Sequence, residues 1–304
     1  MAEPTDSELE VFITRWAASG AHERSNYQLF VAELCDLLDV PRPDPATPDP
    51  DANRYVFERA VPIRGADGET STGFIDVYRR GSFVLETKQG ADAGTTPLEG
   101  AKTGHGKRGT RQWDTALERA YHQARHYVGH LPPAEGRPPF LIVCDVGHVI
   151  EVFAEFTRTG GVYERFPGPR DHRIFLADLR RPEVRDRLRR IWLDPLSLDP
   201  ARHAAEVTRE IAARLAELAR SLEEAGHSPE TVALFLQRCL FTLFAEDIGL
   251  LPPDGFRSIL ERLRDQPAGF PVVATALWRD MATGAAFSAV LMREAASTMA
   301  WMAS

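Results

Sequence analysis

Residues 73–88 read GFIDVYRRGSFVLETK, and this stretch decides the predicted fold. Apolar runs lie on both sides of Arg79, Arg80 and Gly81, a combination typical of a β-hairpin. The runs 73–78 and 82–88 are therefore predicted to pair as strands, and a third strand is predicted at 55–62. Because strand side chains alternate between faces, Glu86 and Lys88 are expected on one face of the sheet.

The predicted hairpin brings two acids and one amine to the same edge. If the turn is centred on Arg80 and Gly81, Asp76 falls roughly opposite Leu85 and Glu86. Hydrolysis of a phosphodiester needs a cation that binds the phosphate and lowers the pKa of the attacking water, and Mg²⁺ prefers hard oxygen ligands. A solvated Glu/Lys pair on a hairpin is the alternative interpretation.

Each residue of this edge receives a predicted role. Asp76 and Glu86 are predicted to bind Mg²⁺, and the backbone carbonyl of Thr87 is a further candidate ligand. Lys88 is predicted to orient or deprotonate the water and to stabilise the pentavalent charge. These residues are therefore the candidate catalytic centre.

Three further residues are candidates for a supporting role. A helix is predicted at 112–130, where Gln123 and Tyr127 are four residues apart and so share a face that braces the site or touches DNA. Glu33, on an earlier predicted helix, is either another carboxylate of the site or a surface glutamate. His122, His126 and His130 lack acidic or cysteine partners at zinc-site spacing, which favours a solvated stripe.

Basic residues gather in the stretch 90–110, which is rich in Gly and Thr and has no apolar periodicity. Lys102, Lys107, Arg108 and Arg111 flank the candidate centre, and we interpret them either as a clamp on the DNA backbone or as part of a disordered, solubilising loop. Lys88, Lys102 and Lys107 are the only lysines among 36 basic residues. Arginine replaces lysine where only charge matters, so the retained lysines point to proton handling, or to chance.

Composition excludes several classes of protein. A net charge of -8 argues against a protein that coats nucleic acid by charge alone. Cys35, Cys144 and Cys239 lie far apart, which supports buried thiols rather than disulfides or a zinc knuckle. No apolar stretch reaches the roughly 20 residues of a membrane span. We therefore expect a cytoplasmic protein with no membrane partner.

The hydrophobic pattern divides the chain into two predicted domains. Residues 1–181 are predicted to form an α/β domain with a mixed central sheet flanked by helices, whose later strands lie at 140–144 and 149–153. From 182 to 304 the period becomes 3.6, which predicts an all-α domain. Its helices are expected at 182–192, 200–225, 229–244, 255–264 and 272–281.

Several segments together resemble a known family. They are Ser25 to Gln28 with Glu33 to Cys35, Asp76 to Lys88, Ala120 to Tyr127, Leu141 to Glu151, and Leu236 to Gly249. In this order they resemble the MmeI-like type IIL restriction–modification enzymes and the related large class I DNA methyltransferases of phage-defence systems. The resemblance implies a PD-(D/E)xK nuclease domain centred on Asp76, Glu86 and Lys88, then a helical spacer domain, and it extends to about Phe287.

The chain also departs from that family. It contains no Asn-Pro-Pro-Tyr motif and no Gly-rich loop for S-adenosylmethionine. We therefore expect the methyltransferase region, with its S-adenosylmethionine, to be missing from a truncated chain and to act in cis or in trans.

The sequence thus favours a Mg²⁺-dependent endonuclease that hydrolyses double-stranded DNA within a restriction–modification system. The alternative is a non-catalytic scaffold that positions DNA for an adenine-N6 DNA methyltransferase. A third interpretation, a small-molecule methyltransferase, requires binding of S-adenosylmethionine.

Overall fold

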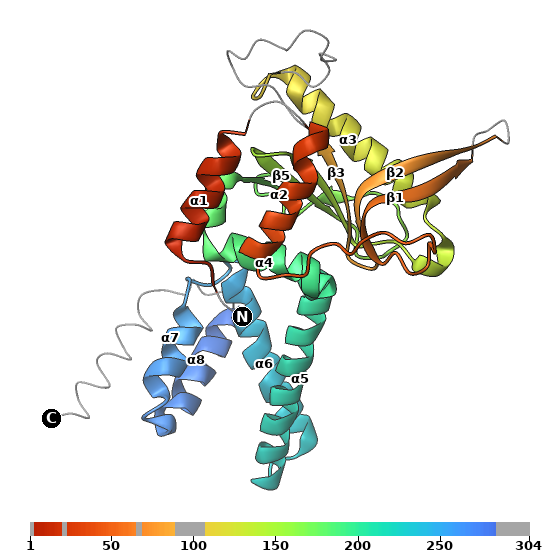
Figure 1. The fold of residues 1–304 in the computed structure, drawn as a ribbon. Coiled ribbons are helices and arrows are strands. Elements are labelled where there is room, and N and C mark those ends of the chain that lie inside the picture. Colours follow the sequence, from red (N-terminus) through yellow and green to blue (C-terminus); the bar gives the residue numbers. More distant parts are fainter. Residues whose placement is uncertain (1–2, 20–22, 65–68, 89–106, 284–304) are drawn as a thin grey trace. The chain divides into compact units, whose positions relative to one another are not determined.

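The computed structural model describes residues 3–19, 23–64, 69–88 and 107–283. The chain forms two compact units, the first ending at Ala204 and the second beginning at Ala205 (Figure 1). Each unit has its own elements and is described separately. Among the described residues, none of the helices combines the length and the apolar character that crossing a membrane requires.

The first unit combines helices with one sheet. Its helices are α1 (Asp6–Ala17), α2 (Glu23–Leu37), α3 (Arg111–His130) and α4 (Pro182–Leu193), with short 3-10 turns at Pro133–Glu135, Leu176–Arg180 and Pro195–Leu198. Its strands are β1 (Tyr55–Arg64), β2 (Thr70–Arg79), β3 (Phe83–Lys88), β4 (Phe140–Asp145), β5 (Val149–Ala154), β6 (Glu164–Arg165) and β7 (Arg173–Phe175).

The sheet is mixed, as the sequence predicts. Its order is β1-β2-β3-β4-β5-β6, and β7 also pairs with β5. Only the pairing of β3 with β4 is parallel among the described strands, and α3 lies between these two strands in the chain. A parallel pair needs such a crossover connection, whereas the antiparallel pairs β2–β3 and β4–β5 are each joined by a three-residue turn. All five strands predicted from the sequence are present, whereas α1, β6 and β7 were not predicted.

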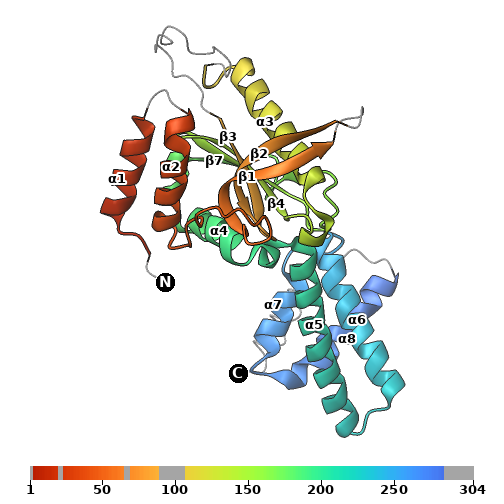
Figure 2. The ribbon, with the colours of Figure 1, turned by 45° about the vertical axis from the view of Figure 1, so that its right-hand side comes forward.

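Helices cover both faces of the sheet. One hydrophobic cluster joins α1, α2 and α4 to one face, and a second joins α3 to the other (Figure 2). Strand alternation supplies both clusters, because Leu85 and Ile142 belong to the first whereas Val84 and Leu141 belong to the second. The residues of β4 are all buried, as expected for a strand covered on both sides.

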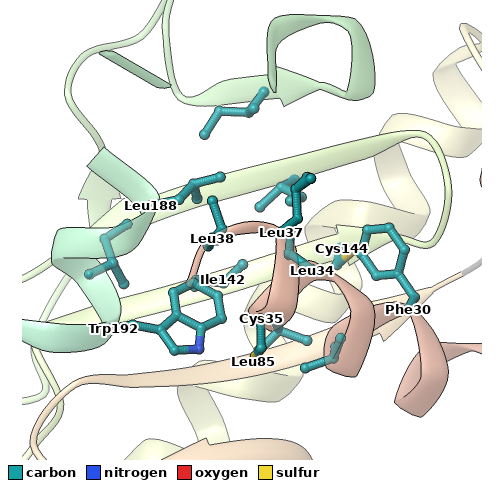
Figure 3. Close-up of a cluster of buried hydrophobic side chains, with 14 of the residues drawn as sticks. Phe30, Leu34, Cys35, Leu37, Leu38, Leu85, Ile142, Cys144, Leu188 and Trp192 are labelled. Carbon is teal, nitrogen blue, oxygen red and sulfur yellow. The ribbon is translucent and has the colours of Figure 1, made fainter. Parts of the chain in front are cut away.

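Helix α4 is part of the first unit. Leu188 and Trp192 pack with Cys35 of α2 and with Leu38, which follows that helix, over the sheet (Figure 3). The indole Nε1 of Trp192 also donates a hydrogen bond to the Tyr55 hydroxyl over 2.9 Å. The sequence placed the domain boundary after residue 181, where helical periodicity begins. The boundary lies later because α4 completes the core of the α/β unit.

The second unit is helical throughout its described part. It takes in most of α5 (Pro200–Glu224), then α6 (Pro229–Asp247), α7 (Gly255–Leu263), a short 3-10 turn at Pro267–Gly269, and α8 (Phe270–Thr283). The helices predicted at 200–225, 229–244, 255–264 and 272–281 are therefore confirmed, with ends that differ by up to three residues. The α/β unit is therefore followed by a helical region, as the sequence predicts.

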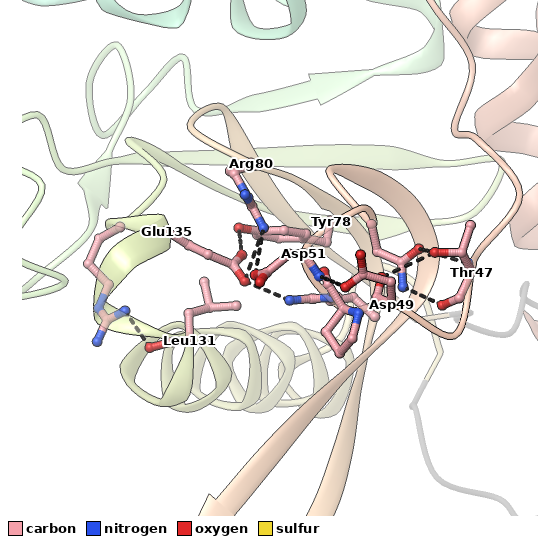
Figure 4. Close-up of polar contacts among 11 residues, drawn as sticks. Thr47, Asp49, Asp51, Tyr78, Arg80, Leu131 and Glu135 are labelled. Atoms are coloured by element: carbon pink, nitrogen blue, oxygen red, sulfur yellow. Dashed lines mark hydrogen bonds and ion pairs between the residues drawn. The ribbon is translucent and has the colours of Figure 1, made fainter.

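A buried ionic network fixes the end of the β2–β3 hairpin. Glu135 accepts a 2.6 Å bond from Arg59 Nη2, lies 3.3 Å from Arg80 Nη2, and accepts a hydrogen bond from the Tyr78 hydroxyl (Figure 4). The side chains of Arg59 and Glu135 are only 4% and 2% exposed. Asp51 also contacts Arg80, at 3.8 Å, but is 89% exposed. Glu135 is therefore the partner that compensates the buried charge of Arg59.

Replacing Glu135 by alanine is expected to lower the free energy of unfolding by about 3–5 kcal/mol, because Arg59 stays buried without a compensating charge. Asp51→Ala is the matched control, since it removes an exposed partner of the same Arg80, and a much smaller loss is expected. Urea denaturation followed by circular dichroism measures both. Equal losses in the two variants would contradict the role given to Glu135.

Candidate functional site

The β2–β3 ladder ends beside the candidate acids. Its pairs are Val77 with Leu85, Tyr78 with Val84 and Arg79 with Phe83. Beyond Val77 the next residues of the two strands are Asp76 and Glu86, which agrees with the register predicted from the sequence. Here the ladder stops, and side chains take over the bonding between the strands.

The carboxylate of Asp76 bonds to the neighbouring strand. Its Oδ2 accepts hydrogen bonds from the backbone N–H and the hydroxyl of Thr87, both over 2.6 Å. Because the backbone ladder between β2 and β3 has ended here, the Asp76 carboxylate provides the acceptor for the backbone N–H of Thr87. Asp76 is thereby held against the Glu86–Lys88 segment.

Lys88 joins the other oxygens of the site. Its Nζ lies 3.0 Å from Glu86 Oε1 and 2.8 Å from the carbonyl oxygen of Thr87. The side chain of Glu86 is 2% exposed and that of Lys88 is 15% exposed, so the contact lies largely away from solvent. A carboxylate oxygen and a carbonyl oxygen thus converge on one cationic group.

Helix α3 supplies the two predicted supporting residues. Gln123 Nε2 donates to Glu86 Oε1 over 2.6 Å and lies 3.3 Å from the Tyr127 hydroxyl. Tyr127 reaches over β2 at Gly73, where a Cβ atom would lie only 2.5 Å from its Cε1. The structure therefore brings Gln123 into contact with Glu86, and Tyr127 into contact with Gln123.

The side chain of Glu33 contacts helix α1. Its Oε2 accepts a 2.8 Å hydrogen bond from Trp16 Nε1, and its Oε1 lies 3.1 Å from Arg15. Both partners belong to α1, so Glu33 ties the first two helices together. Of the two interpretations of Glu33, the contacts favour the one outside the site.

The four basic residues differ in their surroundings. Lys102 lies outside the described residues, and the side chains of Lys107 and Arg111 are exposed. Arg108 is only 9% exposed and binds the fully buried Asp145 through Nε and Nη2, at 2.9 and 2.8 Å. Arg108 is therefore the partner of a buried acid, and its guanidinium is engaged inside the unit.

Two residues near Asp76 were not predicted as part of the site. Glu58 lies across the β1–β2 ladder from Asp76, between the pairs at Phe57 and Arg59, and has a positive φ of 50°. The hydroxyl of Tyr27 donates a hydrogen bond to Glu58. Burial first, and then the bond to Glu58, raise the pKa of Tyr27, with a smaller contribution from the charge of Asp76.

Tyr27 and Glu58 differ in how far the sequence marks them. Tyr27 lies in the segment 25–28 that carries the family resemblance, and this was a usable signal. Glu58 lies within a sequence pattern typical of a strand, and the neighbouring residues do not predict the break in pairing between Phe57 and Arg59.

The donor set fits a hard cation. The Asp76 carboxylate, the Glu86 carboxylate and the Thr87 carbonyl are oxygen ligands of the kind that Mg²⁺ prefers. Two of these oxygens already accommodate the Lys88 ammonium. Among the described residues no group of three or more His, Cys, Asp and Glu side chains is arranged to hold a metal, and the donor set of this edge combines two carboxylates with a backbone carbonyl.

Comparison with known families gives two matches. The model described as the MmeI N-terminal domain matches residues 4–225, and the one described as the MmeI helicase spacer domain matches residues 230–301. No curated protein and no solved structure gives a significant match. The two matched segments follow one another along most of the chain.

Arg108→Ala is expected to lower the free energy of unfolding by about 3–5 kcal/mol, because the fully buried Asp145 loses its bidentate partner. Lys107→Ala, at the exposed neighbouring position, is the matched control and should leave stability nearly unchanged. Denaturant titration of both variants measures the difference. A stable Arg108→Ala protein that has lost only DNA affinity would restore the clamp interpretation.

Proposed function

The chain belongs to the MmeI family of restriction–modification enzymes, and on this premise we propose that its first unit is a Mg²⁺-dependent DNA endonuclease of the PD-(D/E)xK type. The family match confirms the resemblance drawn from the sequence. The observation that carries the proposal is the contact of Lys88 with both Glu86 and the Thr87 carbonyl, beside the carboxylate of Asp76. The substrate we propose is double-stranded DNA.

The residues of this edge have distinct roles in the proposal. Asp76, Glu86 and the carbonyl of Thr87 would hold Mg²⁺, which when bound polarises the phosphate and lowers the pKa of water. Lys88 donates to both oxygens in the present arrangement, so we assign it the orientation of water and the stabilisation of negative charge on the phosphate. In hydrolysis the water oxygen forms a bond to phosphorus while another P–O bond breaks, and the leaving oxygen takes up a proton.

The α3 residues act through Glu86 in this proposal. Gln123 fixes the Glu86 carboxylate by donating to Oε1, and Tyr127 lies behind Gln123. Because the same Oε1 also contacts Lys88, Gln123 and Lys88 together define where the carboxylate lies. Both α3 residues are therefore positioning residues.

The partners of the enzyme follow from the family. We propose that a methyltransferase and target-recognition region, in cis or in trans, supplies sequence specificity and carries the S-adenosylmethionine cofactor. The helical unit, which matches the spacer domain, would connect the nuclease to that region.

Asp76→Asn, Glu86→Gln and Lys88→Met are each expected to lower Mg²⁺-dependent nicking of supercoiled plasmid by about a hundredfold or more, because each removes a cation ligand or the charge beside the phosphate. Excess EDTA should abolish nicking by the wild-type chain. Glu33→Gln is the control, since Glu33 bonds to α1, and it should cut at the wild-type rate if it folds normally.

Two outcomes count against the proposal. Undiminished cutting by the three site variants would place the chemistry elsewhere. A wild-type chain that binds DNA but cuts none with Mg²⁺ would favour the non-catalytic scaffold for a DNA methyltransferase.

A further inference from the structure

A second concave surface lies on the other flank of α3. A cleft of about 960 Å³ is bounded by α3, by β5 and by the segment 163–173. Asp114, Glu118 and Tyr121 of α3 line it. At about 100° per residue these positions lie on the opposite side of the helix from Gln123 and Tyr127, so the cleft is separate from the candidate active site.

The floor of the cleft is aromatic. The rings of Tyr121 and Phe153 lie 4.6 Å apart between centroids, and those of Phe153 and His172 lie 5.8 Å apart. Flat rings that meet at an angle offer faces and edges to a planar ligand, and base–aromatic stacking contributes about 1–3 kcal/mol per base. The floor therefore favours a ligand with an aromatic ring.

Two buried groups in the cleft accept hydrogen bonds. His172 Nδ1 bonds to the carbonyl oxygen of Pro169 over 3.0 Å, so Nδ1 carries a hydrogen. Burial, and then the charge of Arg165, lower the pKa of His172, which favours the neutral ring, in which Nε2 is an acceptor. Nε2 lies 4.0 Å from Glu151 Oε1, too far for a direct bond. Two adjacent acceptors favour a ligand that brings an amino group.

Arginines supply positive charge in and around the cleft. Arg173 binds both Glu151, over 2.5 Å, and Asp114, over 2.7 Å, and so pairs with two of the acids that line it. Arg165 and Arg170 are exposed on the adjoining segment, next to Pro167 and Pro169. Prolines restrict the backbone, which limits the positions that these arginines reach. Arg165 and Arg170 are therefore the residues that would meet an anionic group, on a lining that also carries Glu118 and Glu164.

We propose that this cleft binds a single unstacked nucleotide whose base carries an exocyclic amino group. The base lies against the aromatic floor with its amino group toward His172 Nε2 and Glu151, and the phosphate lies toward Arg165 and Arg170. The volume falls within the range of roughly 300–1,000 Å³ typical of ligand sites. The nucleotide comes either from an unpaired position in a DNA strand or from the free pool.

The first experiment measures binding of free nucleotides to the full chain by equilibrium dialysis, with EDTA present so that nuclease chemistry plays no part. Deoxyadenosine and deoxycytidine monophosphates are expected to bind at least about fivefold more tightly than thymidine monophosphate, which has no exocyclic amino group. His172→Phe keeps a ring and removes the acceptor, so this preference should disappear.

Arginine variants test the phosphate contact on a protein that keeps its fold. Arg170→Ala changes an exposed side chain and should weaken binding about two- to fivefold. Arg181→Ala, an exposed arginine paired with Asp178 and outside the cleft lining, is the matched control and should bind as the wild type does.

DNA duplexes distinguish the two sources of the nucleotide. A duplex with one extrahelical adenine is compared with one carrying an extrahelical thymine and with a fully paired duplex. An adenine preference that depends on Arg170 supports a DNA strand as the source, and binding of deoxyadenosine monophosphate alone supports the free nucleotide. Absence of binding in both formats, equal affinity for adenine and thymine, or equal losses in Arg170→Ala and Arg181→Ala would overturn the proposal.

Discussion

The candidate active site depends on the point at which β2 and β3 separate. Up to Val77 and Leu85 the two strands share a backbone ladder, and one residue further on Asp76 bonds to Thr87 with its side chain instead. If the ladder continued, backbone groups would satisfy one another and the Asp76 carboxylate would have no reason to face the neighbouring strand. The separation therefore brings the oxygens of Asp76, Glu86 and Thr87 to one edge and connects the hairpin to its proposed chemistry.

Buried acids paired with arginine recur in the first unit. Glu135 pairs with Arg59, Asp145 with Arg108, and Glu151 with Arg173. Arginine offers a planar fork of donors that matches a carboxylate, whereas lysine offers a compact charge. Some of the many arginines of the sequence therefore serve internal pairing with acids, and acids still outnumber basic residues in a chain with a net charge of -8. Lys88 offers such a compact charge, and it contacts the Glu86 carboxylate and the Thr87 carbonyl at the candidate site.

The local sequence pattern predicted the strands and helices well. It did not predict the contacts of side chains whose partners lie far along the chain. The hairpin, its register and the α3 residues Gln123 and Tyr127 follow from periods of two and of 3.6 residues. Arg108 was assigned to DNA because its charge looks the same whether it faces a phosphate or Asp145, 37 residues away. The role of Glu33 stayed open for the same reason, since no local pattern predicts that its carboxylate accepts a hydrogen bond from Trp16 Nε1, 17 residues away.

Helix α3 borders both the candidate active site and the cleft, and one buried stripe holds it on the sheet. Trp113, Leu117, Ala120, Ala124 and Val128 are buried against the sheet and hold the helix in place. Gln123 and Tyr127 project on one flank of this stripe, and Asp114, Glu118 and Tyr121 project on the other. Because all are fixed to one helix, the spacing between the candidate active site and the cleft is set by helix geometry. A ligand in the cleft that displaced α3 would therefore move Gln123, and with it the Glu86 carboxylate, without touching either residue.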